Sequence, residues 1–102
     1  MRIHNADKFV PNANNHVTVK NDKTVFLNNQ EIITPVTTSS YLGEERAYLI
    51  AGNLAKVYHA NSTDLATIGD NGAIYIGKQK IVTLTEKDSS PEDICNRINA
   101  LR

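Results

Sequence analysis

The stretch VTVKNDKTVFLNNQEIIT at residues 17–34 and the stretch ATIGDNGAIYIGKQKIVT at residues 66–83 decide the fold, because they carry one pattern twice. Each consists of short β-branched or aromatic runs separated by asparagine, aspartate or glycine, which is typical of strands joined by tight turns. The repeat has an offset of 49 residues and predicts two three-stranded antiparallel β-meanders, at about 17–34 and 65–85. Thr18, Gln30 and Thr34 are matched by identical residues at Thr67, Gln79 and Thr83.

A helical pattern follows the first meander. The segment runs from Glu44 to Ala60. It has acidic residues near its start and basic residues near its end, which suits the dipole of a helix. The pair Gly52 and Asn53 leaves an alternative, in which a turn joins strands at 46–51 and 54–59. We expect the helix, because six apolar residues recur at helical spacing: Ala47, Ile50, Ala51, Leu54, Val57 and Tyr58.

A second helix is predicted at the C-terminal end of the sequence. Ser90 can cap it and Pro91 suits its first position, where no amide hydrogen is needed. Ile94, Ile98 and Leu101 then form one apolar stripe. So short a helix must dock on other elements, because about a dozen residues do not hold a helix in isolation.

These elements predict an α+β fold, in which each three-stranded antiparallel meander is followed by a helix. The helices are expected to pack on one face of the combined sheet. We expect a polar N-terminal arm at 1–15 and one domain at 16–102, with halves at about 16–60 and 65–102. The predicted core includes Val17, Val19, Val25, Leu27, Ile33, Ile50, Leu54, Ile68, Ile74, Ile76, Ile81, Ile94, Ile98 and Leu101.

The overall composition narrows the class of protein. The chain has 102 residues, enough for one domain, and its 11 basic and 11 acidic residues give a formal net charge of zero. Zero net charge argues against a protein built around phosphate neutralisation, and it makes self-association easier. One cysteine cannot form an internal disulfide, and no apolar run resembles a signal sequence or a membrane span. A cytoplasmic protein that does not bind membranes is therefore expected.

No catalytic or metal-binding motif is found. His4, His16 and His59 lack the spacing of zinc ligands, so we expect neither a metal nor another cofactor. The alternative is an enzyme site, in which Cys95 is a nucleophile paired with a histidine. Cys95 falls in the first turns of a predicted helix, where the pKa of a thiol tends to be lowered. Its place beside the apolar stripe indicates instead a small buried side chain.

The meanders carry several lysines. With Tyr75, these lysines could form a basic and aromatic surface that contacts a partner or a nucleic-acid strand. The alternative is that they keep sheet edges soluble and unpaired. The candidate contact residues are Lys20, Lys23, Tyr75, Lys78 and Lys80.

The functional hypothesis is a small non-enzymatic binding or assembly protein that acts through a sheet edge or an exposed helix face. Its partner would be another protein or a second copy, as in a homodimer. An accessory role in a phage or mobile element is an expectation from analogy alone. A nucleic-acid-binding module using the lysine-bearing hairpins is the first alternative, and a small enzyme with a Cys/His site is the second.

Overall fold

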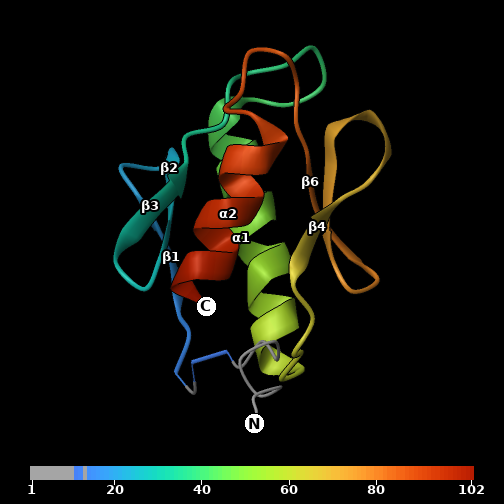
Figure 1. Cartoon of the computed structure of the whole chain (residues 1–102). Helices are drawn as coiled ribbons and strands as arrows, with labels where there is room; N and C mark the ends of the chain where they lie inside the picture. Colours follow the sequence, from blue (N-terminus) through green and yellow to red (C-terminus); the bar gives the residue numbers. More distant parts are fainter. Residues whose placement is uncertain (1–10, 13) are drawn as a thin grey trace, which may run out of the picture.

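Within the described residues, six strands and two helices follow one another in the predicted order (Figure 1). The computed structural model describes residues 11–12 and 14–102, so most of the arm predicted at 1–15 lies outside the described residues. The elements are β1 (Val17–Lys20), β2 (Thr24–Leu27), β3 (Gln30–Ile33), α1 (Gly43–His59), β4 (Ala66–Ile68), β5 (Ala73–Ile76), β6 (Gln79–Thr83) and α2 (Pro91–Leu101).

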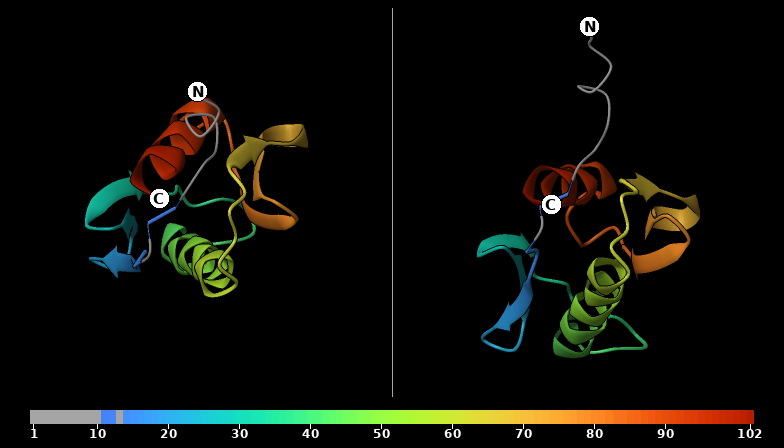
Figure 2. Two further views of the ribbon diagram at one scale, coloured as in Figure 1. Left: turned by 60° about the horizontal axis from the view of Figure 1, so that its bottom comes forward. Right: turned by 90° about the horizontal axis from the view of Figure 1, so that it is seen from below.

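The strands form two separate antiparallel sheets, β1-β2-β3 and β4-β5-β6, and each is followed by its helix, as predicted. The two meanders do not join into one combined sheet. Instead, the sheets lie on either side of the two helices (Figures 1 and 2). Helix α1 packs on β1, β2 and β6, and α2 packs on β4, β5 and β3. Each helix therefore contacts its own sheet and the last strand of the other sheet.

The strand register repeats as closely as the sequence. Val25 pairs with Ile33 and Phe26 with Glu31, which leaves Ile32 as an extra residue in β3. Forty-nine residues later, the same irregularity leaves Ile81 as an extra residue in β6. A β-bulge of this kind places two consecutive side chains on one face, which strict alternation does not allow. The two halves therefore share a bulge as well as a strand order.

Both bulges are held by a side chain from the helix of the other half. Arg97 of α2 donates a hydrogen bond of 2.8 Å to the carbonyl oxygen of Ile32. Asn53 of α1 donates one of 3.0 Å to the carbonyl oxygen of Ile81. Buried backbone groups need such partners, because an unpaired one costs about 1–3 kcal/mol. The halves are consequently interlocked by hydrogen bonds as well as by packing.

Residues 43–59 form one continuous helix, so the hairpin alternative is not adopted. The amide of Leu42 donates to the Glu45 carboxylate at 2.8 Å, which fixes the start of α1. The second helix begins as predicted, with Ser90 Oγ accepting a hydrogen bond of 3.2 Å from the amide of Asp93. Gly52 lies on the exposed side of α1 and does not break the helix.

Replacing Gly52 with alanine should raise the free energy of unfolding by about 1 kcal/mol, the difference in helix propensity between the two residues. A Cβ atom added at Gly52 would meet no atom within 4 Å among the described residues, so no clash offsets the gain. Urea unfolding at low protein concentration measures the change. A loss of stability would show that α1 is strained at this position.

The core lies between the sheets and the helices and contains most of the predicted residues. Among the predicted core residues, Val17, Val19 and Leu101 are only partly buried. The prediction for Ile68 is wrong, because 47% of its surface is exposed. It is the last residue of a short edge strand, where it lines a shallow hollow beside Glu92. Cys95 is buried, as its place beside the apolar stripe indicated. The other buried apolar residues outside the predicted core list are Ile32, Ala47, Val57, Ala66, Ala73, Val82 and Leu84.

A buried ion pair ties α1 to the loop before α2. Arg46 Nη2 lies 2.8 Å from Asp88 Oδ2, and both side chains are almost inaccessible to solvent. The Asp88 carboxylate also accepts hydrogen bonds of 2.9 Å from the amide of Val36 and 2.8 Å from the amide of Thr85. Arg46 in turn donates to the carbonyl oxygen of Thr83 at 3.1 Å. This network joins the two helix-preceding loops.

Candidate functional site

The candidate contact residues lie on two different sheets. Lys20 and Lys23 belong to β1 and to the turn that follows it, in the first sheet. Tyr75, Lys78 and Lys80 belong to β5, to the next turn and to β6, in the second sheet. Because the helices separate the sheets (Figure 1), the structure does not bring all five residues onto one surface.

Lysine and aromatic side chains pair on both outer sheet faces. The Lys20 ammonium lies 4.3 Å from the centre of the Phe26 ring. The Lys80 ammonium lies 6.0 Å from the centre of the Tyr75 ring. Phe26 and Tyr75 are equivalent positions of the repeat, and the lysines occupy the ring faces by cation–π attraction. Each pair thus packs on its own sheet.

Cys95 is buried, with 6% of its surface exposed, and it packs within the core. Burial, with a smaller contribution from the charge of Glu92, raises the pKa of the Cys95 thiol. A raised pKa lowers the fraction of thiolate, which is the nucleophilic form. His16 and His59 line a pocket between β1 and α1, whereas Cys95 lines a different hollow beside β4. His4 lies outside the described residues.

The outward side of α1 carries an exposed stripe of six residues, called here the α1 stripe. Spacings of three and four place them on one side of the helix. The opposite side is buried, with Ile50 and Leu54 in the core. The α1 stripe consists of Leu42, Glu45, Leu49, Gly52, Lys56 and His59.

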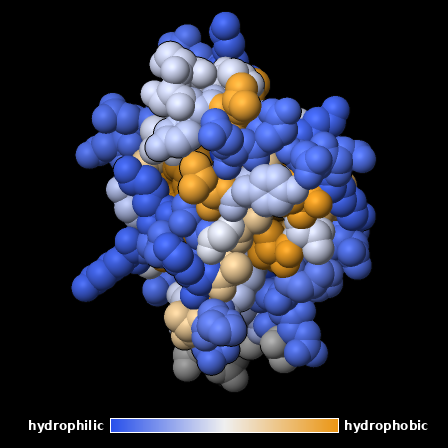
Figure 3. All heavy atoms as spheres, turned by 180° about the vertical axis from the view of Figure 1, so that it is seen from behind, coloured by the Kyte–Doolittle hydropathy of each residue, from blue (hydrophilic) through white to orange (hydrophobic). Residues whose placement is uncertain are grey.

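Large apolar side chains gather at the N-terminal half of the α1 stripe. Tyr41, Leu42, Tyr48 and Leu49 each expose between 51% and 56% of their surface. Figure 3 views the molecule from behind and shows hydrophobic areas among hydrophilic ones on that face. The Tyr48 hydroxyl donates to the carboxylate of Asp22 at 2.6 Å, which fixes this side chain. Such a gathering is more informative than scattered exposed residues, because apolar patches mark contact sites.

A hollow of about 400 Å³ lies beside this patch, between α1 and β6. Tyr41 and Leu49 form part of its wall, and Ile81 and Val82 line it from β6. Lys80 and Asn53 add polar groups. The hollow extends the exposed apolar surface from the helix onto the second sheet.

The apolar residues of 44–60 predicted the buried side of the helix, and no residue of the α1 stripe was a candidate for contact. Leu42 and Leu49 were the missed signal, because they are large apolar residues that fall outside the buried stripe. Helical periodicity identifies such residues as exposed once the helix itself is assigned.

Comparisons with protein-family models, with curated proteins and with solved structures find no match for this chain. Within residues 11–12 and 14–102, no group of three or more His, Cys, Asp or Glu side chains is arranged to hold a metal ion. In the same residues, neither helix is long and apolar enough to cross a membrane.

Proposed function

We propose that this is a non-enzymatic assembly protein whose contact surface is the α1 stripe and whose partner is a second copy of the chain. The observation that carries the proposal is the stripe itself: an exposed helix face with two leucines, a central glycine and opposite charges at its two ends. In the proposed dimer, the two α1 helices run antiparallel across a two-fold axis. This is the commonest symmetry of small assemblies.

The spacing of the stripe suits such a pair. With the axis between residues 50 and 51, Leu49 of one copy faces Gly52 of the other. Nothing lies within 4 Å of the Cβ position of Gly52 among the described residues, so the leucine has room there. A small residue opposite a large one lets two helices approach closely and interdigitate. The Leu49 side chains of the two copies would then fill the centre of the contact.

The charges of the stripe are also complementary in this arrangement. Glu45 of one copy faces Lys56 of the other, and the acidic start of each helix lies beside the basic end of its partner. The chain has zero formal net charge, so no long-range repulsion opposes the encounter. A parallel pair would place like charges together, which disfavours it.

The dimer should be detectable by native mass spectrometry as a species of twice 11.3 kDa. One helix face buries less than the roughly 1,200–2,000 Å² of a standard interface, so we expect weak association with a Kd on the order of micromolar or above. Leu49→Glu and Gly52→Arg should each shift the population to monomer, because a charge or a bulky group then occupies the centre of the contact. Circular dichroism checks that both variants remain folded.

Leu65→Glu is the matched control, since Leu65 is also an exposed leucine, at 45%, but lies outside the α1 stripe. This variant should keep the dimer. A charge exchange gives a sharper test of orientation: Glu45→Lys alone should weaken the dimer, and Glu45→Lys with Lys56→Glu should restore it. A wild-type chain that stays monomeric at about 1 mM, roughly a thousandfold above a micromolar Kd, would overturn the proposal.

The hypothesis of a nucleic-acid-binding module gains no support from the placement of its residues, because they are divided between two sheets. A Cys/His enzyme is likewise not favoured by a buried thiol with a raised pKa. An assembly role that uses an exposed helix face is the hypothesis that the geometry supports best.

A further inference from the structure

The two sheets have four edge strands, and helix side chains hydrogen-bond the backbone of three of them within the described residues. Arg97 binds the carbonyl oxygen of Ile32 on β3. Asn53 and Arg46 bind the carbonyl oxygens of Ile81 and Thr83 on β6. The edge of β4 is bound by Asn99 of α2. Such contacts protect an edge, whose unpaired amides and carbonyls otherwise attract a partner.

The contact at β4 is made by a single carboxamide. Asn99 Oδ1 accepts a hydrogen bond of 2.8 Å from the amide of Ala66. Asn99 Nδ2 donates one of 3.1 Å to the carbonyl oxygen of the same residue. One asparagine side chain thereby satisfies both outward backbone groups of Ala66.

The equivalent residue of β1 is Val17, 49 positions before Ala66. The amide of Asn28 donates to the carbonyl oxygen of His16 at 2.9 Å, so His16 belongs to a hydrogen-bonded pair of the ladder. Hydrogen-bonded and non-hydrogen-bonded pairs alternate, and the backbone groups of Val17 therefore point outward from the sheet. No hydrogen bond from residues 11–12 or 14–102 reaches these two groups.

The helix residue that faces Val17 explains the difference. Buried positions match between the helices at an offset of 48, with Ile50 corresponding to Ile98. Ala51 then takes the place of Asn99, and it has no polar group to offer. The first half thus lacks the carboxamide that closes the edge in the second half.

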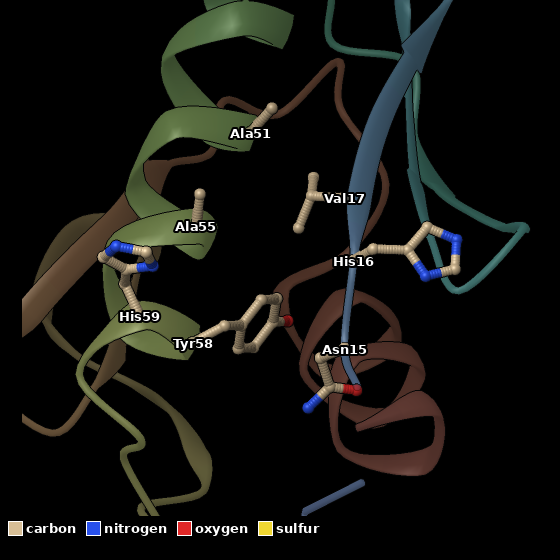
Figure 4. A pocket seen from close by; sticks show the side chains of 7 residues that line it. All are labelled: Asn15, His16, Val17, Ala51, Ala55, Tyr58 and His59. Carbon is tan, nitrogen blue, oxygen red and sulfur yellow. The ribbon is translucent and has the colours of Figure 1, made fainter. Parts of the chain in front are cut away.

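A pocket of about 260 Å³ occupies this place between β1 and α1, and it is called here the β1–α1 pocket. Figure 4 shows Ala51 and Ala55 on the helix side and Val17 on the strand side, with Tyr58 reaching from the helix toward the strand. The ring of His16 points away from the pocket. The volume is below the roughly 300–1,000 Å³ of small-molecule sites, which suits one side chain better than a cofactor.

Tyr58 adds a third polar group. Its hydroxyl oxygen is buried and has no hydrogen-bond partner among the described residues. Burial raises the pKa of Tyr58 to about 12, and the charge of Arg102 only partly opposes this. The phenol therefore keeps its proton at neutral pH and remains a hydrogen-bond donor.

We propose that the β1–α1 pocket binds the carboxamide of an asparagine or glutamine side chain supplied by a partner protein. The carboxamide oxygen accepts from the Val17 amide and its nitrogen donates to the Val17 carbonyl oxygen, as Asn99 does at Ala66. A carboxylate lacks the donor that the Val17 carbonyl needs, so the site discriminates asparagine from aspartate. The site adjoins the α1 stripe only at His59, which lines the pocket as well, and Val17 lies on the side of α1 that packs on the first sheet.

The probe is N-acetyl-asparagine methylamide, titrated into the ¹⁵N-labelled full chain and followed by NMR. We expect a saturable downfield shift of the Val17 amide, with a Kd on the order of millimolar for so small a ligand. N-acetyl-aspartate methylamide is the matched control and should cause no saturable shift there. Equal shifts with both probes would overturn the selectivity for a carboxamide.

Two substitutions test directly whether the contact of Asn99 with Ala66 is the model for binding at Val17. Ala51→Asn should supply the missing carboxamide from within the chain, protect the Val17 amide from hydrogen exchange and abolish binding of the probe. Ala100→Asn places the same group on the exposed side of α2 and should leave binding unchanged. Asn99→Ala should open the equivalent site, so that the probe now also shifts the Ala66 amide. Binding that survives Ala51→Asn, or the absence of any saturable shift in the wild-type chain, would overturn the proposal.

Discussion

Replacing Asp88 with alanine should lower the free energy of unfolding by about 3–5 kcal/mol, the usual cost of removing one partner of a buried ion pair. The guanidinium of Arg46 would stay buried without its counter-charge. The amides of Val36 and Thr85 would also lose their acceptor. Small domains are stable by only about 5–15 kcal/mol, so the variant should unfold at a much lower urea concentration than the wild type. Equilibrium urea unfolding at pH 7 measures the loss.

The same ion pair predicts a dependence on acid. Burial alone would raise the pKa of Asp88, but hydrogen bonds from Arg46, Thr85 and Val36 outweigh it and hold this pKa below its ordinary value of 3.8. The folded state therefore binds the proton more weakly than the unfolded state. The contribution of Asp88 to stability is complete above pH 3.8 and is lost as the pH falls through the lower, folded-state pKa. The stability difference between the wild type and Asp88→Asn should shrink in that range.

Glu86→Ala is the control, because Glu86 lies in the same loop and is exposed. It should change stability by no more than about 0.5 kcal/mol, as is usual for surface substitutions. A loss of less than about 1 kcal/mol for Asp88→Ala would contradict the role of the ion pair, given the 3–5 kcal/mol expected when such a pair is broken.

Replacing Ile98 with alanine should lower the free energy of unfolding by about 2–5 kcal/mol, because the side chain is fully buried and its removal leaves a cavity. Ile98 lies on α2, which packs on strands of both sheets. The cavity would therefore weaken contacts in both halves of the fold. Thermal and urea unfolding, monitored by circular dichroism, measure the effect.

Ile50→Ala provides a comparison within the same molecule. Ile50 is the matching residue of α1 and is 2% exposed, so its replacement should cost a similar amount. Ile68→Ala is the control, because that isoleucine is exposed and should contribute much less. If α2 could detach while the first half stayed folded, Ile98→Ala would produce two separate unfolding transitions. We expect a single transition.

The repeat pattern was enough to predict the elements. Turn residues such as Asn28 and Gly77 take positive φ angles at equivalent places, as asparagine and glycine tolerate. The spacing of Ile50 and Leu54 gave α1 in spite of Gly52, because burial of an apolar stripe outweighs one unfavourable residue. Ser90 and Pro91 gave the start of α2, since both act through local geometry.

The alternation rule failed at the bulges and at one strand end. The predicted core contained Ile33 and Ile81 but not their neighbours Ile32 and Val82. Both members of each pair are buried, because a bulge turns two consecutive side chains inward. Ile68 was likewise assigned to the core as an alternate strand residue, but its position at the end of an edge strand leaves it exposed. Neither outcome follows from local sequence, because both depend on where the neighbouring strand and helix end.

The candidate sites depended more strongly on tertiary structure. The sequence contained Leu42 and Leu49, but only the packing of α1 between the sheets shows which of its sides stays exposed. The β1–α1 pocket could not be inferred at all, because it results from an alanine at the position where the other helix has an asparagine. The five candidate contact residues were grouped because they are basic or aromatic residues of the meanders. In the fold they lie on two different sheets.

By itself, the sequence determined the two meanders, their turns, the two helices and the equivalence of the halves. These features rest on interactions between residues close in the chain, namely turn conformation, side-chain periodicity and helix capping. Only the tertiary structure decided that the sheets stay separate, that each helix contacts the last strand of the other half, and that β1 keeps an edge that no described helix side chain binds. Those outcomes rest on contacts between residues far apart in the chain, such as Arg97 with Ile32 and Asn53 with Ile81, which no local pattern encodes.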